Sequence, residues 1–422
     1  MRVAILGVGT VGSEVANVLL RNQKLISARS GMNITPVVGV VRDLNKKRDS
    51  KIPLSDDINS VIDRDDIDVY VELMGGIDEP YKVVSKILEK KKPIVTANKA
   101  MLAYHRNELE KLAGDTPFGY EASVAGGIPI IKALREGLSA NHIQKIVGIM
   151  NGTSNYILTN MMQGGVKFDE VLKKAQELGY AEADPTFDIG GFDTAHKLLI
   201  LASLAYSVHA KPEDILIEGI EGITNEDIYF ANEFEYAIKL LAIAKRREDK
   251  VELRVHPALI QKEKMIAKVD GVMNAVSVTG DAVGESLFYG AGAGGSATAS
   301  AVISDLIDIA REVKNPMLGY KAPLEVLPLG LFKPNEIKTK YYLRLKVVDE
   351  IGVLAKITNL MSQNNLSIDS FLQKPRIDKS LDFSTLYFTT HTCLEADMLR
   401  VVGLLQSESF IKDRPFMIRI ED

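Results

Sequence analysis

Little in this chain supports a disulfide, a membrane span or a nucleic-acid surface. It has one cysteine, Cys393, which excludes an intrachain disulfide and a metal site built on several thiolates. The formal net charge of −5 gives no basic footprint for nucleic acid. No apolar run approaches the roughly 20 residues of a membrane-spanning helix, and the N-terminus lacks the long apolar region of a secretory signal. These absences favour a cytoplasmic protein.

The first patterned stretch is a short apolar strand, residues 3–6, followed by Gly7-Val8-Gly9-Thr10-Val11-Gly12 and a helical pattern. A strand, a GxGxxG turn and a helix in this order indicate a dinucleotide site. The first glycine permits a tight turn, the second lets a pyrophosphate approach the backbone, and the third lets the helix pack on the strand. A purely structural glycine turn is the alternative.

Basic residues follow the second predicted strand, residues 34–41. Arg42 comes directly after it, and Lys46, Lys47 and Arg48 are close behind. An acidic side chain at this strand end would bond the ribose 2′-hydroxyl of NAD, whereas an arginine accommodates the 2′-phosphate of NADP. Arg42 therefore favours NADP(H) over NAD(H). The alternative is that the basic run is only a solvated face.

Three further predicted strands end in turns that suit ligand binding. Residues 69–73 lead to Met74-Gly75-Gly76, residues 94–95 lead to Thr96-Ala97-Asn98-Lys99, and residues 118–122 lead to a glycine pair. Ligands of an open parallel sheet bind at the carboxyl ends of its strands. Lys99 would then lie where a nicotinamide ring belongs; a surface lysine at a helix start is the alternative.

An acidic stretch from Gly179 to Lys197 leads into an apolar helix and contains Glu182 and Asp193. Asp193 is predicted to cap that helix, which places Lys197 one turn further along the same face. Such a stretch could hold a small polar substrate beside its proton donor. The alternative is an Asp–Lys surface pair that contributes little stability.

Residues 151–155 open another helix. Ser154 or Thr153 is expected to cap it, or the turn offers an anion site suited to a substrate carboxylate. The glycine-dense residues 289–298 precede a further helix and either approach a cofactor or cross between domains. The histidines lack metal-ligand spacing, so we interpret them as structural: His142, His196, His209 and His256.

These patterns predict an α/β protein of several domains. We expect a Rossmann-type nucleotide-binding domain over residues 1–130 and an α/β substrate-binding and dimerisation domain over 131–300. A helix over 300–315 is expected to return to the first domain. After a polar linker over 334–340, residues 341–422 follow the order strand–helix–strand–strand–helix–strand, which is typical of a ferredoxin-like βαββαβ unit. An appended unit of this kind suggests regulation.

Several of these motifs together resemble homoserine dehydrogenase, in the family's order. They are GVGTVG (7–12), ELMGG (72–76), TANKA (96–100), EASVAGGIP (121–129), NGTSNYIL (151–158), GYAEADPTFD (179–188) and DTAHK (193–197). The tail, with DEIGVL at 349–354 after its first strand, resembles an ACT domain. The resemblance implies reversible NAD(P)H-dependent reduction of aspartate 4-semialdehyde to homoserine, in threonine and methionine biosynthesis.

The resemblance also implies roles for single residues. Lys197 would donate a proton to the forming alkoxide, with Lys99 assisting or contacting the nicotinamide and Asp193 beside them. Substrate contacts would come from Glu182, suited to the amino group, and from Asp193, Thr153 and Lys197. The cofactor would be lined by the glycine-rich turn, Arg42, Gly75, Thr96, Lys99, Gly179 and Gly294. A monovalent cation, Na⁺ or K⁺, would be held by Glu121 and the carbonyls of Val124, Gly126 and Ile128.

For the tail, the resemblance implies an amino-acid effector, commonly threonine, at Asp349, Gly352, Val353 and Leu354. A homodimer or homotetramer is expected. Two other functions compete with this interpretation. A semialdehyde dehydrogenase forms a thioester on a cysteine, and the single cysteine lies in the tail. A non-catalytic sensor would keep the glycine-rich turn without needing Glu182, Asp193 and Lys197 together.

Overall fold

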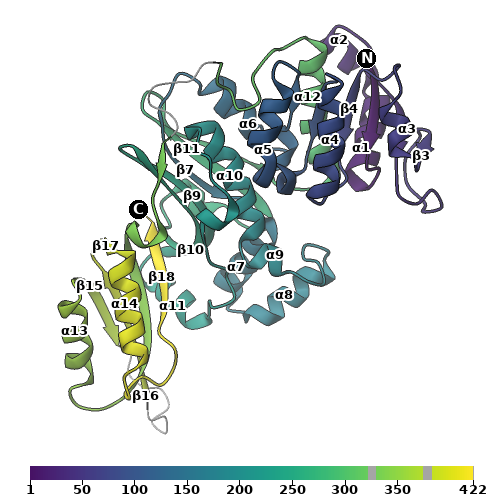
Figure 1. The fold of residues 1–422 in the computed structure, drawn as a ribbon. Helices are drawn as coiled ribbons and strands as arrows, with labels where there is room; N and C mark the ends of the chain where they lie inside the picture. Colours follow the sequence, from purple (N-terminus) through teal and green to yellow (C-terminus); the bar gives the residue numbers. More distant parts are fainter. Residues whose placement is uncertain (322–328, 374–382, 422) are drawn as a thin grey trace.

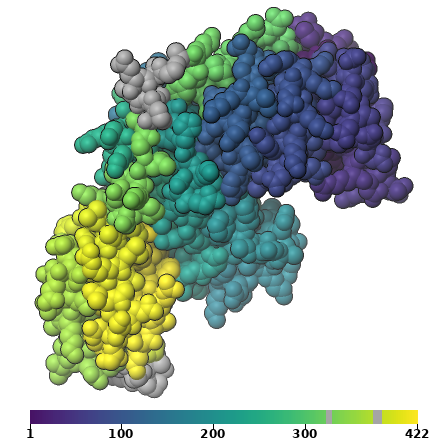
Figure 2. Space-filling view, in the orientation of Figure 1, coloured from purple at the N-terminus to yellow at the C-terminus, as the bar shows by residue number. Residues whose placement is uncertain are grey.

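The computed structural model describes residues 1–321, 329–373 and 383–421. The chain forms three lobes that follow one another in sequence, a nucleotide-type unit, a central unit and a tail (Figures 1 and 2). Residues 374–382 and 422 of the predicted tail lie outside the described residues. Within the described ranges, no helix has the length and apolar character to cross a membrane.

The first unit is a six-stranded parallel sheet in the order β3-β2-β1-β4-β5-β6. Its strands are β1 (Arg2–Leu6), β2 (Thr35–Val40), β3 (Leu54–Ser55), β4 (Val69–Glu72), β5 (Ile94–Thr96) and β6 (Phe118–Gly119). Its helices are α1 (Thr10–Arg21), α2 (Gln23–Ser30), α3 (Ile58–Ile62), α4 (Asp78–Glu89) and α5 (Lys99–Ala113). The strand order reverses between β1 and β4, where a nucleotide binds in such sheets. The predicted Rossmann-type fold is confirmed.

Two segments depart from the simple alternation in this unit. The predicted strand over residues 118–122 ends early, because Glu121–Ser123 form a 3-10 turn. Helix α12 (Gly295–Ala310), late in the sequence, packs on α1, β5 and β6. Apolar residues of α12, including Val302 and Leu306, share one core with Val3, Ile5 and Val15.

The central unit places helices on one mixed sheet in the order β12-β11-β7-β9-β10. Its strands are β7 (Ile143–Ile149), β8 (Leu216–Ile217), β9 (Tyr236–Arg247), β10 (Lys250–Gln261), β11 (Met273–Gly280) and β12 (Gly284–Ala291). Its helices are α6 (Ile130–Lys132), α7 (Gly152–Gly164), α8 (Phe168–Glu177), α9 (Thr186–Ile189), α10 (Phe192–Tyr206) and α11 (Asn225–Glu233).

Helix α10 is the core helix of the molecule. Its residues 193–204 are all buried, as expected of a helix that is apolar on every side. It packs on β9 and β10 and also against α5 of the first unit. Polar side chains near its N-terminus are therefore held rigidly between two units.

The tail continues the central sheet. Its elements are β13 (Gly330–Leu331), β14 (Lys338–Val348), α13 (Val353–Gln363), β15 (Ile368–Gln373), β16 (Phe383–Thr390), β17 (Cys393–Leu394), α14 (Glu395–Gln406) and β18 (Phe416–Glu421). The order β18-β14-β16-β15 is the predicted ferredoxin-like arrangement. β18 also pairs in parallel with β10. The tail is therefore built into the sheet, and residues 338–340 of the expected linker are already strand.

Candidate active site

The glycine-rich turn lies in a cavity of about 810 Å³ at the carboxyl end of β1. Gly7 has a φ of +100°, and a side chain there would meet the Leu73 carbonyl oxygen at 2.5 Å. A side chain at Gly12 would lie 2.2 Å from the Gly7 carbonyl oxygen. At Gly9, by contrast, no atom lies within 4 Å of the position of a Cβ. The turn is thus closed toward the protein and open at Gly9, which fits a pyrophosphate.

Basic side chains line the same cavity. Arg42, Lys46, Lys47 and Arg48 all border it. The Arg42 guanidinium lies 2.7 Å from Glu79 Oε2 on a well-exposed edge. Arg48 donates to two carbonyl oxygens of its own loop, those of Asp43 and Lys46. Arg42 is therefore placed where a ligand carrying additional phosphate could displace the exposed Glu79 contact.

The other predicted cofactor residues fall into two groups. Gly75, Gly179 and Gly294 are exposed and have positive φ values, and Thr10 is exposed at the start of α1. Gly294 precedes α12, whose first residue, Gly295, lies against Thr10. Val11, the next residue of α1, is partly buried. The structure thus brings Gly294 to the glycine-rich turn.

Thr96 belongs to a buried polar group instead. It is fully buried, its hydroxyl donates to Glu72 Oε2 at 2.5 Å, and the same hydroxyl accepts from the Asn98 N–H. Glu72 also accepts from the Met74 N–H at 2.7 Å. The expected contact of Thr96 with the cofactor stays a prediction, and it would have to come from the backbone because the side chain is enclosed. Glu72, which the sequence reasoning missed, ties the ends of β4 and β5 together.

The Asp193 carboxylate is the centre of the second cluster. It is 3% exposed, and its Oδ2 accepts from the Lys197 ammonium at 2.7 Å. Its Oδ1 lies 2.9 Å from the ammonium of Lys99, which comes from the start of α5 in the first unit. Lys197 also donates to the Met150 carbonyl oxygen at 2.6 Å. Two lysines from different units thus meet at one buried carboxylate.

Asp193 does not cap its helix as predicted. The N-cap residue is Gly191, and no side-chain cap bond is formed. Asp193 lies inside the first turn, where a negative charge is favoured by the helix dipole. Its carboxylate is free to face the two lysines because it is not bonded to the helix N-terminus.

Asn151 and Asp188 support this carboxylate, and the sequence reasoning assigned a role to neither. The Asn151 amide donates to Asp193 Oδ2 at 3.0 Å and to Asp188 Oδ1 at 2.8 Å. Asn151 also caps α7 by accepting from the Ser154 N–H, so the expected capping by Ser154 or Thr153 is wrong. The Thr153 hydroxyl donates to the Tyr180 carbonyl oxygen at 2.6 Å. The expected contact of Thr153 with the substrate stays a prediction, and the Tyr180 carbonyl oxygen would compete for the same hydroxyl.

The surroundings of the two lysines shift their pKa values in opposite directions. Burial lowers the pKa of Lys197; Asp193 opposes this, and the Lys99 charge adds to the lowering, so the net shift is downward. Burial also acts to lower the pKa of Lys99, but the Asp193 carboxylate outweighs it and raises that pKa. Burial opposes the ionisation of Asp193, yet the two ammonium groups hold its pKa below the usual range. Lys197 is the more readily deprotonated lysine.

Glu182 and His196 flank this cluster. Glu182 is exposed on the loop before α9, and its charge contributes to the raised pKa of Lys99. Its carboxylate is therefore close enough to act on the same site. His196 packs edge-on against Tyr104 and Phe187, and burial lowers its pKa. A neutral, packed imidazole agrees with the structural interpretation.

The predicted cation loop has an unusual backbone. Ala125 and Gly126 have φ values of 53° and 45°, so two consecutive residues are left-handed. The Glu121 carboxylate accepts from the backbone N–H groups of Ile131 at 2.9 Å and Lys132 at 2.8 Å. Burial and the nearby Asp305 raise the pKa of Glu121 to about 7. The side chain thus also caps α6, which the sequence did not suggest.

The loop also carries Val124 and Ile128, both buried, whose carbonyls were assigned to the cation. Among the residues of the described ranges, no group of three or more His, Cys, Asp or Glu side chains is arranged to hold a metal. A site here would therefore depend on backbone carbonyls.

The predicted effector residues lie in the loop after β14 and in the first turn of α13. Gly352 has a φ of +88° and precedes α13, while Val353 is buried. Asp349 and Leu354 are exposed, and Ile351 between them is fully exposed. The loop is therefore accessible from solvent.

Comparison with known proteins covers every part of this architecture. Residues 7–118 match the model described as homoserine dehydrogenase, NAD binding domain; residues 129–307 match homoserine dehydrogenase; residues 341–409 match the ACT domain. The homoserine dehydrogenase of Helicobacter pylori is 53% identical over 423 residues, covering 100% of this chain and 99% of that relative.

Solved structures agree with the sequence matches. A homoserine dehydrogenase from Thiobacillus denitrificans superposes with a TM-score of 0.93 at 43% identity, covering 100% of this chain and 98% of that one. A hyperthermophilic archaeal homoserine dehydrogenase in complex with NADPH gives a TM-score of 0.64 at 25% identity, covering 75% of this chain and 99% of that one. The chain therefore belongs to the homoserine dehydrogenase family, with an ACT domain as its tail.

Proposed function

We propose that Lys197 is the proton donor in the reduction of aspartate 4-semialdehyde to homoserine. A hydride that reaches an aldehyde carbon leaves a developing alkoxide, which needs a proton or a positive charge beside it. The Lys197 ammonium has three N–H donors, and Asp193 and Met150 take two of them. The third is available to the substrate oxygen. A reduced nicotinamide cofactor, held by its pyrophosphate at the glycine-rich turn, would supply the hydride.

The observation that carries this proposal is the shared Asp193 carboxylate. It fixes the Lys197 ammonium at 2.7 Å and the Lys99 ammonium at 2.9 Å. Lys99 has its pKa raised and stays charged, so it stabilises the alkoxide electrostatically. Lys197 has its pKa lowered and is the better acid. Glu182, exposed on the adjoining loop, is suited to the substrate ammonium group.

NADP(H) is the proposed cofactor. Support comes from Arg42, Lys46, Lys47 and Arg48, which border the cavity that holds the glycine-rich turn. A guanidinium binds phosphate with two parallel hydrogen bonds. The archaeal relative described above was solved with NADPH. We therefore assign the 2′-phosphate to Arg42.

We further propose two other ligands, a bound cation and an amino-acid effector. A monovalent cation would bind the loop of Glu121, Val124, Gly126 and Ile128, where Ala125 and Gly126 have left-handed backbone. Threonine would bind the loop from Asp349 to Leu354 of the ACT domain, whose exposure and helix start suit a small amino acid. The homodimer or homotetramer stays a prediction.

Replacement of the proton donor tests the mechanism. Lys197→Ala should lower kcat by roughly 10²–10⁴-fold, while the Kd for NADPH, measured by cofactor fluorescence, stays within about twofold of the unchanged chain. Lys239→Met is the matched control, since Lys239 is another buried lysine paired with an aspartate, at 2.9 Å from Asp270. An unchanged kcat in Lys197→Ala, or a loss of NADPH affinity, would remove Lys197 from this role.

A further inference from the structure

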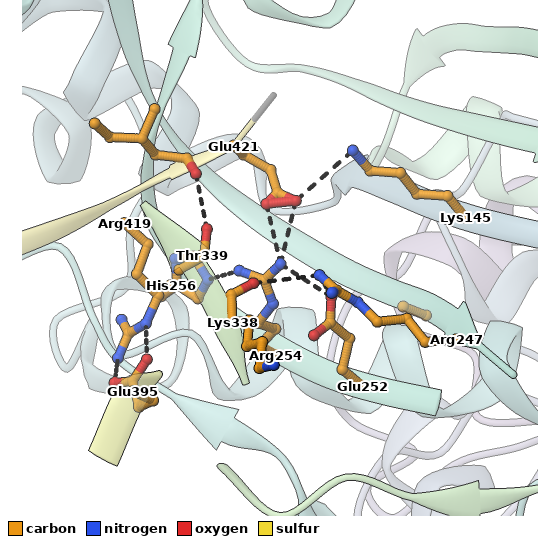
Figure 3. Close-up of polar contacts among 12 residues, drawn as sticks. Lys145, Arg247, Glu252, Arg254, His256, Lys338, Thr339, Glu395, Arg419 and Glu421 are labelled. Carbon is orange, nitrogen blue, oxygen red and sulfur yellow. Dashed lines mark hydrogen bonds and ion pairs between the residues drawn. The ribbon is translucent and has the colours of Figure 1, made fainter. Parts of the chain in front are cut away.

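A buried arginine joins the last strand of the ACT domain to the central unit. Arg419 of β18 is 1% exposed, and its guanidinium is held by Glu395 at the start of α14 (Figure 3). The same guanidinium donates to Glu218 of the central unit, to Oε2 at 2.7 Å and to Oε1 at 2.8 Å. Two parallel charge-assisted bonds fix both distance and orientation. The tail therefore holds the Glu218 carboxylate in one position.

Glu218 lies in a segment that packs against the C-terminal end of α9, just before α10. Its N–H donates to the Val255 carbonyl oxygen of β10 at 2.8 Å. Two residues on, the Ile220 N–H donates to the Ile189 carbonyl oxygen at 2.9 Å. Between them, a side chain at Gly219 would lie 2.7 Å from that same Ile189 oxygen. The backbone from 218 to 220 thus lies in close contact with Ile189.

Ile189 is the neighbour of Asp188, whose carboxylate orients the Asn151 amide at 2.8 Å. Asn151 in turn donates to Asp193 at 3.0 Å. A continuous series of hydrogen bonds and close contacts therefore runs from Arg419 to the carboxylate that holds both lysines. Physical continuity of this kind can carry coupling between two sites.

We propose that Glu218 and Arg419 are positioning residues for turnover, through which the ACT domain sets the placement of Asp188, Asn151 and Asp193. The inference rests on the proposed roles of Asp193 and Lys197. It assigns to the tail a contribution to the rate that is distinct from effector binding, because the Arg419–Glu218 contact is made by the chain's own residues.

The chain offers a matched control at the same domain boundary. Arg344 of β14 donates to Glu226 Oε2 of α11 at 2.9 Å. The side chains of Glu218 and Glu226 are 38% and 39% exposed. The residue before Glu226, Asn225, bonds to the Gly165 carbonyl oxygen, beyond the C-terminal end of α7, whereas Asn151 lies at the other end of that helix. Both glutamates join the tail to the central unit, but only Glu218 leads to Ile189.

Glu218→Gln and Glu226→Gln in the full chain separate a positioning role from a structural one. Both should lower the Tm by similar amounts. Glu218→Gln should also lower kcat roughly tenfold, since small misplacements of reacting groups are costly, with the KM for NADPH unchanged. Glu226→Gln should keep its kcat. Arg419→Lys, which keeps the charge but loses the two-pronged geometry, should reproduce the loss. An unchanged kcat in Glu218→Gln, or an equal loss in Glu226→Gln, would overturn the proposal.

A double-mutant cycle with Asp188→Asn tests the route. If Glu218 acts through Ile189 and Asp188, the effect of Glu218→Gln on kcat should shrink severalfold when Asp188 is already replaced; full additivity would overturn the route. The Lys197→Ala experiment remains separate. Full activity in Lys197→Ala would contradict the proposed role of Lys197 as proton donor. The comparison of Glu218→Gln with Glu226→Gln would still show whether Glu218 affects turnover.

Discussion

The ammonium of Lys99 lies 2.9 Å from Asp193 Oδ1, and this contact joins the first unit to the central unit. Asp193 holds Lys197 with its other oxygen. One buried carboxylate between two ammonium groups gives these three side chains together a net positive charge, which suits a developing alkoxide. It also makes the two lysines unequal, since the pKa of Lys99 is raised and that of Lys197 is lowered.

The two directions of the reaction should respond oppositely to pH. Reduction needs protonated Lys197, so its kcat should fall as pH rises, with a midpoint below the ordinary 10.5. Oxidation of homoserine needs the neutral amine, so its kcat should rise over the same interval. Lys99→Met should move both midpoints upward, because the Lys99 charge helps to lower the pKa of Lys197. The measurement is kcat against pH in both directions; profiles of the same sign would contradict it.

Replacement of Arg42 should change the choice between cofactors. Arg42→Ala removes the proposed partner of the 2′-phosphate, and a charge-assisted pair contributes about 1.5–3 kcal/mol. The KM for NADPH should therefore rise by roughly ten- to a hundredfold. The KM for NADH, which lacks that phosphate, serves as the internal control and should stay within about twofold. Equal changes in the KM values for NADPH and NADH would show that Arg42 does not bind the 2′-phosphate.

The effector response should depend on the loop before α13. Gly352 has a φ of +88°, which a β-branched residue adopts only with strain. Gly352→Val and Asp349→Ala should both weaken inhibition by threonine at least about tenfold. Gly403→Ala, in α14, is the control, since no atom lies within 4 Å of its Cβ position. Threonine inhibition that persists unchanged in both loop variants would place the effector elsewhere.

A cation at the Glu121 loop should appear in the pH dependence of stability. The folded-state pKa of Glu121 is raised from 4.5 to about 7, so its neutral form is favoured by folding. Its contribution to the free energy of unfolding is complete below pH 4.5 and is lost as pH rises through 7. Asp305, with a pKa raised to about 6 by burial, acts in the same direction.

A bound cation favours the ionised carboxylate and should offset this loss. The Tm at pH 8 should therefore be higher in KCl or NaCl than in tetramethylammonium chloride at equal ionic strength, by a few degrees. At pH 5, where Glu121 is neutral, the salts should differ little. Identical Tm values at pH 8 would remove the cation from this loop.

Local patterns predicted much of the fold and part of the site. The GVGTVG turn and the i, i+4 spacing of Asp193 and Lys197 are properties of short segments, so they could be recognised directly. The family resemblance is also confirmed by the comparisons. The meeting of Lys99 with Asp193 could not be derived in this way, because it depends on how α5 packs against α10.

Two other features of the structure correspond to weaker patterns in the sequence. Asn is as favourable an N-cap as Ser, so Asn151 before GTSN could have been preferred over Ser154 as the cap of α7. In β10, Glu252, Arg254 and His256 alternate on one face of an otherwise apolar strand. That alternation indicates a buried polar contact, and the partners are found on β18 and β7: Arg254 contacts Glu421, which also faces Lys145 (Figure 3). Nothing local specifies that β18 is the neighbouring strand.

The direct pairing of β18 with β10 has a consequence for any shortened form of the enzyme. A chain that stopped before residue 338 would leave residues 258–260 of β10 without their partner strand, and Arg254 would lose the carboxylate of Glu421. Edge strands with unpaired backbone groups can pair with other chains, which promotes aggregation. The ACT domain therefore shields an edge of the central sheet, and heat should melt the ACT domain and the central unit together in one cooperative step.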